Sequence, residues 1–494
     1  MPKIVILWTD AAFFLLVLMA LFYAWRASRH SGSRQNWRKV LQDRTAMCAA
    51  VVLALFVLVA LLDSMHYRPR LPPAPGQPAT AAPAYAPQVR SVLDALLDTT
   101  LLAKSEKSYS VPLATHLFTK ETMLAVDGAA YRDFPRLIYA GVHLDDPEAD
   151  WHGDVTGRLL KGALAGVVAA LLAGAAVGSL LARRQGWQSL LSGRSAVPWR
   201  AMWLTFLVVC LVVGVLASLA GGYHVFGTDR TGNDVLWQAL KSIRTALVIG
   251  TLTTLAMLPP ALIFGISAGY FKGWVDDLIQ YIYTTLTSIP GVLLIAACVL
   301  MMQVYIDTHP EMFPTSAARA DLRLFLLCLI LGLTGWAGLC RLLRAEVLKL
   351  RELEYIQAAR AFGVSHLRIM LRHLLPNVMH IVLITMVLEF SGLVLYEAVL
   401  SYLGIGVDPG MNSFGSMIDM ARLEMSRDPM VWWNLTTAFF FMLVLVLAAN
   451  LFADAVREAF DPHGRRYRVR RRLSRHVAGN QPALSGTAGG ERNT

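Results

Sequence analysis

Apolar residues along this chain fall into discrete blocks of about 20, the length that an α-helix needs to cross about 30 Å of hydrocarbon. Short polar connectors rich in arginine separate most blocks, and one long polar stretch follows the second block. The pattern predicts an all-α polytopic membrane protein with about nine transmembrane helices. The predicted spans are residues 4–25, 46–62, 161–182, 201–221, 243–269, 279–303, 323–342, 379–403 and 431–453.

Composition agrees with a membrane protein. Hydrophobic residues make up 55% of the chain, charged residues only 16%, and the mean hydropathy is +0.49, well outside the range of an ordinary soluble domain. The formal net charge of +11 raises the possibility of a nucleic-acid partner. Because the Lys and Arg residues cluster between the apolar blocks, we expect the lipid bilayer, and no nucleic acid, as their partner.

The basic connectors predict the orientation of the chain. Lys and Arg gather in residues 26–44, 183–200, 346–378 and 465–472. Short loops rich in these residues stay in the cytoplasm. Nine alternating crossings place all four segments on one side, so we expect a periplasmic N-terminus and a cytoplasmic C-terminus.

The first 200 residues precede the last six predicted spans and are predicted to contain three additional helices and a long polar segment. Residues 1–62 are predicted to hold two extra transmembrane helices, with a first block too long for a cleaved secretory signal. Residues 63–160 are predicted to form a periplasmic Pro/Ala-rich linker and a small acidic segment. Residues 161–200 add a third extra helix and a basic cytoplasmic loop, and residues 466–494 are predicted to be a basic, disordered cytoplasmic tail.

The cysteines favour neither a disulfide framework nor a metal site. All five lie in or beside apolar blocks, without a CxxC spacing or a nearby histidine cluster. We therefore predict that they are small buried apolar residues and that the chain binds no metal. These residues are Cys48, Cys210, Cys298, Cys328 and Cys340.

The sequence of residues 354–377 predicts a helix that ends at a glycine, followed by a second helix. The first part is rich in alanine, which favours a helix with a flat surface. Gly363 can adopt the left-handed conformation that ends a helix, and Ser365 is a suitable N-cap for the next one. Pro376 is expected to stop that second helix before the next span.

The second helix of this segment is predicted to be amphipathic, because Arg368 and Arg372 alternate with leucines. Such a helix can dock into a groove of a partner protein. It can equally lie on lipid headgroups as a surface connector, and the residues alone leave both possibilities open.

This segment resembles the EAA loop of ABC importer permeases. Ala358, Ala359, Gly363, Leu375 and Pro376 stand at the matching positions, and the ending Arg-His-Leu-Leu-Pro-Asn resembles the dipeptide and oligopeptide branch. Gln357 and His373 depart from the pattern, replacing the leading Glu and the usual Ile. The resemblance implies an ATPase-coupling loop that consists of Glu354, Gln357, Ala358, Ala359, Gly363, Arg368, Arg372, Leu375 and Pro376.

Further stretches resemble the same branch in the same order. A GTDxxGRD-like element, also interpretable as a capped turn, precedes one span, and a GYxGGxxD-like turn follows it. The matching residues are Gly227, Thr228, Asp229, Gly232 and Asp234 in the first, and Gly269, Tyr270, Gly273 and Asp276 in the second. Three further groups of matches follow along the chain. The first, in a kinked core helix, consists of Ser288, Ile289 and Pro290. The second, in an ExxLSFLGLG-like element and the WGxM-like element after it, consists of Glu397, Ser401, Leu403, Gly404, Gly406, Pro409, Gly415 and Met417, and the third, near the C-terminus, consists of Asn450, Asp454, Ala455, Arg457, Asp461 and Pro462.

The resemblance covers residues 201–465. It implies the six-helix core of a type I ABC importer, as its C-type permease subunit, in the bacterial inner membrane. The implied partners are a second, non-identical permease, two ATP-binding subunits and a periplasmic solute-binding protein. Peptide, nickel, opine and glutathione importers share this pattern, so the solute stays open.

No GxxxxGK[ST] loop occurs, and the sequence contains no Gly-Lys pair. We therefore expect no cofactor on this chain and no enzymatic activity of its own, with ATP and Mg used by partner subunits.

Two acids in the eighth span deserve a functional hypothesis, because an uncompensated charge in hydrocarbon costs several kcal/mol. Glu389 either lines the pathway or pairs with a neighbouring helix, whereas Glu397 is structural or faces the binding protein. An alternative is an ion-coupled secondary transporter or a polytopic membrane enzyme that uses both acids directly. Candidates for the pathway or the periplasmic face are Pro290, Glu389, Glu397, Ser401, Gly404 and Gly406.

Overall fold

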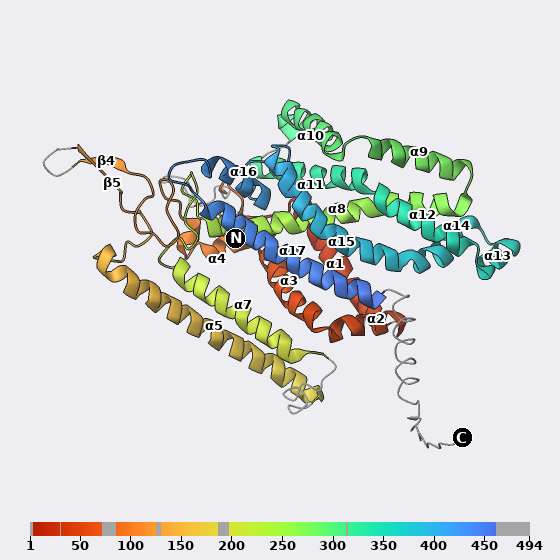
Figure 1. Ribbon diagram of the computed structural model, residues 1–494, viewed down its shortest axis with the longest axis horizontal. Helices are drawn as coiled ribbons and strands as arrows, with labels where there is room; N and C mark the ends of the chain where they lie inside the picture. Colours follow the sequence, from red (N-terminus) through yellow and green to blue (C-terminus); the bar gives the residue numbers. More distant parts are fainter. Residues whose placement is uncertain are drawn as a thin grey trace, which may run out of the picture.

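The computed structural model describes residues 3–29, 31–71, 85–124, 130–185, 197–312 and 315–460. The chain forms an elongated bundle of helices (Figure 1). Strands β4 (Glu121–Leu124) and β5 (Ala130–Asp133) lie at one end, here called the insert end. Helices α13 (Glu354–Ala361) and α14 (His366–Ile369) lie at the other, here called the loop end.

Helices before residue 221 are α1 (Trp8–Arg29), α2 (Ser31–Gln42), α3 (Arg44–Asp63), α4 (Val92–Leu97), α5 (Pro147–Gln185) and α7 (Trp199–Ala220). Helix α2 was not predicted, since its sequence is strongly basic. Helix α5 begins at Pro147, well before the predicted span, because Glu148 and Asp150 in its first turn favour a helix N-terminus.

The remaining helices are α8 (Val235–Phe271), α9 (Trp274–Ser288), α10 (Gly291–Thr308), α11 (Ser316–Gly335), α12 (Ala337–Arg351), α13 (Glu354–Ala361), α14 (His366–Ile369), α15 (Leu375–Tyr402), α16 (Phe414–Glu424) and α17 (Trp433–Phe460), with a π turn at Met370–Leu374. Short 3₁₀ turns occur at Leu101–Ala103 and Pro310–Met312.

Within the described residues, eight helices are long and apolar enough to span a membrane, and a ninth span results if α11 and α12, bent by 41°, are counted as one. The predicted number of about nine is thus confirmed. The predicted span 279–303 is broken, since α9 ends at Ser288 and α10 begins at Gly291. Pro290 separates them because it supplies no backbone N–H for a continuous helix.

Helix α8 is the centre of the bundle, and two buried apolar clusters surround it. One, in the half near the insert end, includes Ile249, Leu324 and Trp433. The other, in the half near the loop end, includes Leu343 and Ile369. Both halves of the molecule are therefore held to the same central helix.

Helix α3 packs along α8 and α17, while α7 packs mainly on α5 and α3. The α5–α7 pair is close because glycines line it: a Cβ on Gly166 would collide with the carbonyl oxygen of Cys210, and one on Gly162 would lie 2.6 Å from that of Gly214. The α5–α7 hairpin is thus a tight unit at the edge of the bundle, as Figure 1 shows.

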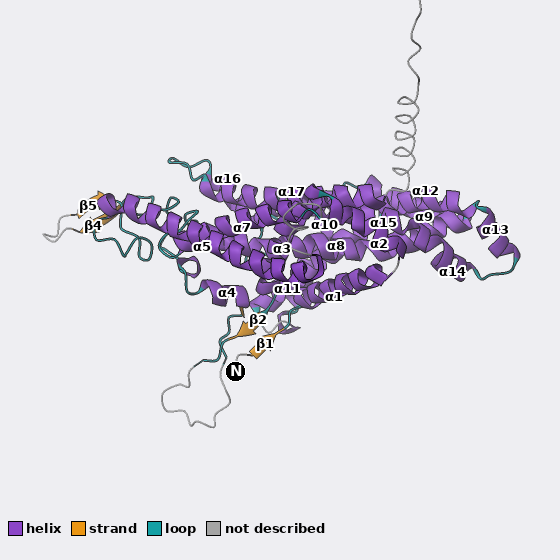
Figure 2. Cartoon of the chain, turned by 90° about the horizontal axis from the view of Figure 1, so that it is seen from below, coloured by secondary structure: helices purple, strands orange, loops and turns teal. Residues whose placement is uncertain are grey.

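The segment predicted as a linker and small acidic segment, residues 63–160, contributes strands to two small sheets. Strand β2 (His66–Arg68) pairs antiparallel with both β1 (Lys3–Val5) and β3 (Arg90–Ser91), and β4 (Glu121–Leu124) pairs with β5 (Ala130–Asp133). Figure 2 shows β1 and β2 on one side of the bundle. Most of the proline-rich stretch, from 72 to 84, and the predicted tail, 466–494, lie outside the described residues.

All five cysteines are free; Cys328 and Cys340 are buried and the other three half-buried. Among the described residues, no group of three or more His, Cys, Asp or Glu side chains could hold a metal ion.

Candidate coupling site

The predicted glycine break is present at the loop end. Helix α13 ends at Phe362, and Gly363 has a φ of 71°. The Val364 N–H bonds to the Ala359 carbonyl at 3.1 Å, and the Gly363 N–H bonds to the Arg360 carbonyl at 3.0 Å. These two bonds form a Schellman motif, which requires the left-handed residue. A Cβ on Gly363 would meet no atom within 4 Å, so glycine is needed here for its conformation rather than for space.

The helix after the break does not stop at Pro376, contrary to the sequence prediction. Helix α14 passes through the π turn directly into α15, and Pro376 lies in the first turn of α15. The wider π turn accommodates the proline ring, which would clash with the preceding turn of a regular α-helix. Ser365 precedes α14, but its side chain makes no capping hydrogen bond.

The candidate coupling segment, residues 354–377 and below called the coupling segment, is anchored by a few side chains and otherwise exposed. Ile356 and Ile369 are fully buried, whereas Phe362 is 87% exposed and Leu367 and Leu371 are 63% and 56% exposed. The remaining predicted coupling residues are exposed, except for the partly buried Ala359 and Leu375. They are Glu354, Gln357, Ala358, Gly363, Arg368, Arg372 and Pro376. Large apolar side chains and basic side chains of this segment are thus both exposed.

The GYxGGxxD-like turn is bonded to this segment, which sequence reasoning did not foresee. The Tyr270 hydroxyl lies 2.8 Å from Nδ1 of His366, and Nη1 of Arg351 donates to the Tyr270 carbonyl at 2.6 Å. Gly269 allows α8 and α12 to approach, because a Cβ there would lie 2.7 Å from Cβ of Val347. Gly273 has a φ of 57° and turns the chain into α9.

An ion pair fixes the same turn to α12. The Asp276 carboxylate accepts from Nε and Nη2 of Arg344 at 2.6 and 2.7 Å. These bonds hold the pKa of Asp276 below its usual value, against the opposing effect of burial. Nearby, Nζ of Lys272 lies 2.9 Å from Oε1 of Glu352. The α8–α9 turn, α12 and the coupling segment therefore form one connected unit.

The GTDxxGRD-like element lies at the insert end and forms the capped turn considered above. Thr228 accepts from the Ser110 N–H at 2.7 Å. Asp229 accepts from the N–H groups of Thr231 and Asn233 at 2.8 and 2.9 Å. Gly227 and Gly232 have φ of 73° and 79°. The element thus holds the segment between α3 and α5, which contains Ser110, on the bundle.

Asp234 joins this turn to a buried histidine. It caps α8 through the Leu236 N–H at 2.8 Å, and its other oxygen lies 2.7 Å from Nδ1 of His224. Nε2 of His224 is 3.5 Å from Glu106, whose carboxylate also accepts three backbone N–H bonds, from residues 138–140. Burial alone would lower the pKa of His224, but the two carboxylates outweigh it and raise the pKa to about 9.

The two acids of the eighth span have different surroundings. Glu397 is buried, accepts from the Ser401 hydroxyl at 2.7 Å and packs against Gly415. It therefore does not reach the molecular surface. Glu389 is exposed at mid-length of α15 and bonds to no residue that the structure describes.

The other candidates of the outer face turn the chain or separate helices. Gly404 has a φ of 74°, and Gly406 lies so close to Ser401 that a Cβ would collide with its hydroxyl. Pro290 separates α9 from α10. In the C-terminal motif, Asn450 accepts from the Ser391 hydroxyl at 2.6 Å, and Asp461 and Pro462 lie outside the described residues.

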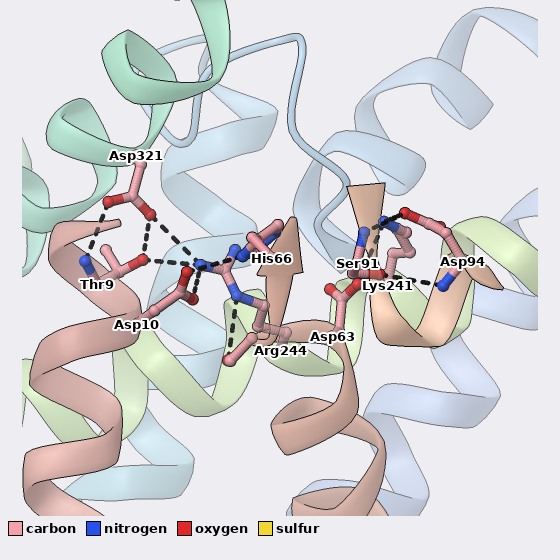
Figure 3. Close-up of polar contacts among 10 residues, drawn as sticks. Thr9, Asp10, Asp63, His66, Ser91, Asp94, Lys241, Arg244 and Asp321 are labelled. Carbon is pink, nitrogen blue, oxygen red and sulfur yellow. Dashed lines mark hydrogen bonds and ion pairs between the residues drawn. The ribbon is translucent and has the colours of Figure 1, made fainter. Parts of the chain in front are cut away.

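A buried charge cluster, which could not be located from the sequence alone, ties the N-terminal helices to the bundle (Figure 3). Nη2 of Arg244 in α8 lies 2.6 Å from Asp10 of α1 and 3.3 Å from Asp321 of α11. Lys241, one turn earlier in α8, lies 2.8 Å from Asp94 and 3.2 Å from Asp63. Each cation is thus paired with two acids.

Residues 261–466 match the family described as "Binding-protein-dependent transport system inner membrane component". The oligopeptide transport system permease protein OppC of Haemophilus influenzae is 30% identical over 244 residues, covering 49% of this chain and 72% of that protein. OppC of Mycobacterium bovis is 33% identical over 248 residues, covering 50% and 79%. The dipeptide transport system permease protein DppC of Bacillus subtilis is 28% identical over 302 residues, covering 58% and 88%.

Proposed function

Because this chain belongs to the family of binding-protein-dependent transport system inner membrane components, the permeases of ABC importers, we propose that it forms part of the passage for peptides or related small solutes. It is a multi-pass membrane protein. The peptide class is supported by the oligopeptide and dipeptide permeases to which it is similar.

One observation carries the mechanism: the exposed helical break at Gly363 is bonded to the transport bundle at several points. Docking of an ATPase subunit would engage the outward side chains, including Phe362 and Leu367. Movement of the docked ATPase subunit would be transmitted to α8 through the hydrogen bond between His366 and Tyr270. It would be transmitted to α15 through the continuous helix that α14 forms with α15. The spans would then tilt and open the path alternately to the two faces.

In this proposal, the complete transporter also contains partner subunits. Two ATPase subunits use ATP and Mg, because this chain lacks the phosphate-binding loop sequence. A second, non-identical permease forms the other half of the passage, and a periplasmic solute-binding protein delivers the solute.

The orientation belongs to the same proposal: the loop end is cytoplasmic in the bacterial inner membrane. The basic helix α2 and the C-terminal end of α17 lie toward the loop end, as does the coupling segment (Figure 1). Positive loops favour the cytoplasmic side. The N-terminal strand β1, paired with β2, would then be periplasmic.

Replacement of Gly363 tests the coupling role. Gly363→Val cannot readily take a φ of 71°, whereas Gly363→Asn tolerates it. Since no atom lies within 4 Å of a Cβ at this position, any effect arises from the backbone. We expect Gly363→Val to insert into membranes but to lose co-purifying ATPase subunits, and Gly363→Asn to keep most of them. Unchanged ATPase binding and uptake in Gly363→Val would show that the segment does not couple.

A further inference from the structure

A cavity of about 660 Å³ lies between the end of α12 and the bend of the coupling segment. Its lining includes Arg351 and Glu352 at the end of α12, Gln357 and Arg360 of α13, and residues 363–366 at the glycine break. Most of these residues are exposed, so a partner can enter the cavity from outside the molecule. The cavity therefore brings side chains of three neighbouring elements to one accessible site.

The acid in this cavity is already matched by cations. Among the described residues that line the cavity, Glu352 is the only acid. Its Oε1 lies 2.9 Å from Nζ of Lys272 and 3.9 Å from Nε of Arg351. Gln357 stands where the EAA pattern has a glutamate, so α13 adds no carboxylate to the lining. The positive charge of the cavity thus exceeds its negative charge.

Arg360 carries the positive charge that is left unmatched. It is exposed and forms no hydrogen bond or ion pair with any described residue, whereas Nη1 of Arg351 donates to the Tyr270 carbonyl at 2.6 Å. Burial therefore does not hold Arg360 in place, and no acid of this chain neutralises it. Its guanidinium group can bind both oxygens of a carboxylate at once.

Two further groups in the lining can donate hydrogen bonds. The Ser365 side chain makes no capping hydrogen bond, so its hydroxyl hydrogen is free. Nε2 of Gln357 donates one hydrogen to the Glu352 carbonyl at 3.2 Å and keeps its second hydrogen. A guanidinium group, a hydroxyl and an amide N–H thus line the same cavity, and the ligand that matches them is an anionic acceptor.

Large apolar side chains flank the cavity and indicate a protein as its occupant. Phe362 and Leu367, which stand on either side of residues 363–366, are 87% and 63% exposed. A small free anion would leave both side chains in water, whereas a protein surface that carries an acid would cover them. Helix α13 also lies at the extreme of the loop end (Figure 1), where a soluble subunit can reach it. Apolar anchors beside a charged pair are typical of protein interfaces.

We propose that this cavity receives a carboxylate side chain of the ATPase subunit, with Arg360 as its ionic partner and with Phe362 and Leu367 packed against the surrounding ATPase surface. The inference rests on the proposed function and names the chemistry by which this chain recognises its ATPase. Arg360 is then a specificity determinant. An ATPase subunit with an apolar residue at the facing position would leave the guanidinium group unpaired on docking, which disfavours that subunit.

The test measures the Kd of the ATPase subunits for the complete permease pair in nanodiscs. We expect Arg360→Gln to raise this Kd about tenfold, the effect of one lost charge-assisted hydrogen bond. The difference should shrink at an ionic strength of about 1 M, where the Debye length is about 3 Å. Gln357→Glu should also raise the Kd several-fold, because the added carboxylate would pair with Arg360 and repel the acid of the ATPase subunit. Arg38→Gln, which removes an exposed arginine of α2, is the matched control and should bind as wild type.

A charge exchange identifies the facing acid. Arg360→Glu should bind the ATPase subunit more weakly than Arg360→Gln does, because two carboxylates would then face each other. Surface acids of the ATPase subunit are changed to lysine one at a time, and one of these changes should restore binding to Arg360→Glu. If none of them does, the ligand is not a carboxylate of that subunit and the inference is wrong.

Two other outcomes would overturn the inference while the coupling role of the segment remains. One is an unchanged Kd in Arg360→Gln. The other is a loss of binding that occurs only in nanodiscs containing phosphatidylglycerol and not in those of phosphatidylcholine alone, because the ligand would then be an anionic lipid. A wild-type permease pair that binds no ATPase subunit would instead refute the proposed function itself.

Discussion

The Tyr270 hydroxyl lies 2.8 Å from Nδ1 of His366, although the two residues are 96 positions apart in the chain. The contact joins the last turn of α8 to the first turn of the helix that continues into α15. The coupling segment is therefore bonded to the central helix of the bundle as well as to the helices that flank it in sequence.

Tyr270→Phe removes this bond and keeps the ring. Loss of one partly buried hydrogen bond costs about 1 kcal/mol, too little to unfold the protein. We expect ATPase subunits to bind as before, while the number of solute molecules transported per ATP falls several-fold. Uptake and ATP hydrolysis measured together in proteoliposomes give this ratio. Tyr281→Phe, at a side chain that is 71% exposed, is the control; equal ratios in both variants would contradict a coupling role for Tyr270.

The buried His224 predicts a pH-dependent stability at the insert end. Its pKa is raised to about 9, above the unfolded value of about 6.5. The stabilising contribution is therefore complete below about pH 6.5 and is lost as the pH rises through about 9. It amounts to at most about 3 kcal/mol, from 1.36 kcal/mol per pKa unit. The thermal unfolding midpoint in nanodiscs should fall between pH 7 and pH 9.5.

His224→Gln supplies the comparison, because glutamine cannot gain the charge. Its unfolding midpoint should be lower than that of wild type at pH 7, and the difference should shrink toward pH 9.5. A wild-type midpoint that changes with pH no more than that of the variant would rule out His224 as the titrating group.

Asp10→Ala should detach the N-terminal helix from the bundle. The substitution leaves Arg244, which is 4% exposed, with a weaker set of partners, and breaking such a buried pair costs about 3 to 5 kcal/mol. We expect faster proteolysis within residues 3–29 and a lower unfolding midpoint. Asp133→Ala, in the exposed strand β5, should change neither. Wild-type protease resistance in Asp10→Ala would show that the cluster does not hold α1.

Local features could be predicted from sequence because they arise from neighbouring residues. The left-handed Gly363 follows from the backbone chemistry of one residue, and Pro290 was predicted to kink a helix that the structure breaks completely. The prediction at Pro376 was wrong because a proline can also be accommodated by a widened turn, and nothing in the local sequence distinguishes the two outcomes.

Long-range contacts could not be predicted in the same way. Arg244 lies 234 residues from Asp10, and their pairing depends on how α1 packs against α8. From sequence, Lys241 and Arg244 are only two basic residues near the start of a span. A basic residue inside an apolar block does require an acidic partner, but the sequence does not say which of several acids is near.

The π turn at Met370–Leu374 sets the rotational phase between the two ends of one continuous helix. A residue contributes about 100° of rotation in an α-helix, so shortening this turn by one residue would rotate α15 by about that angle relative to α14. A different face of α15 would then lie in line with the exposed Leu367 of α14. The extra residue thus acts as an angular offset between the exposed segment at the loop end and the helix that runs on through the bundle.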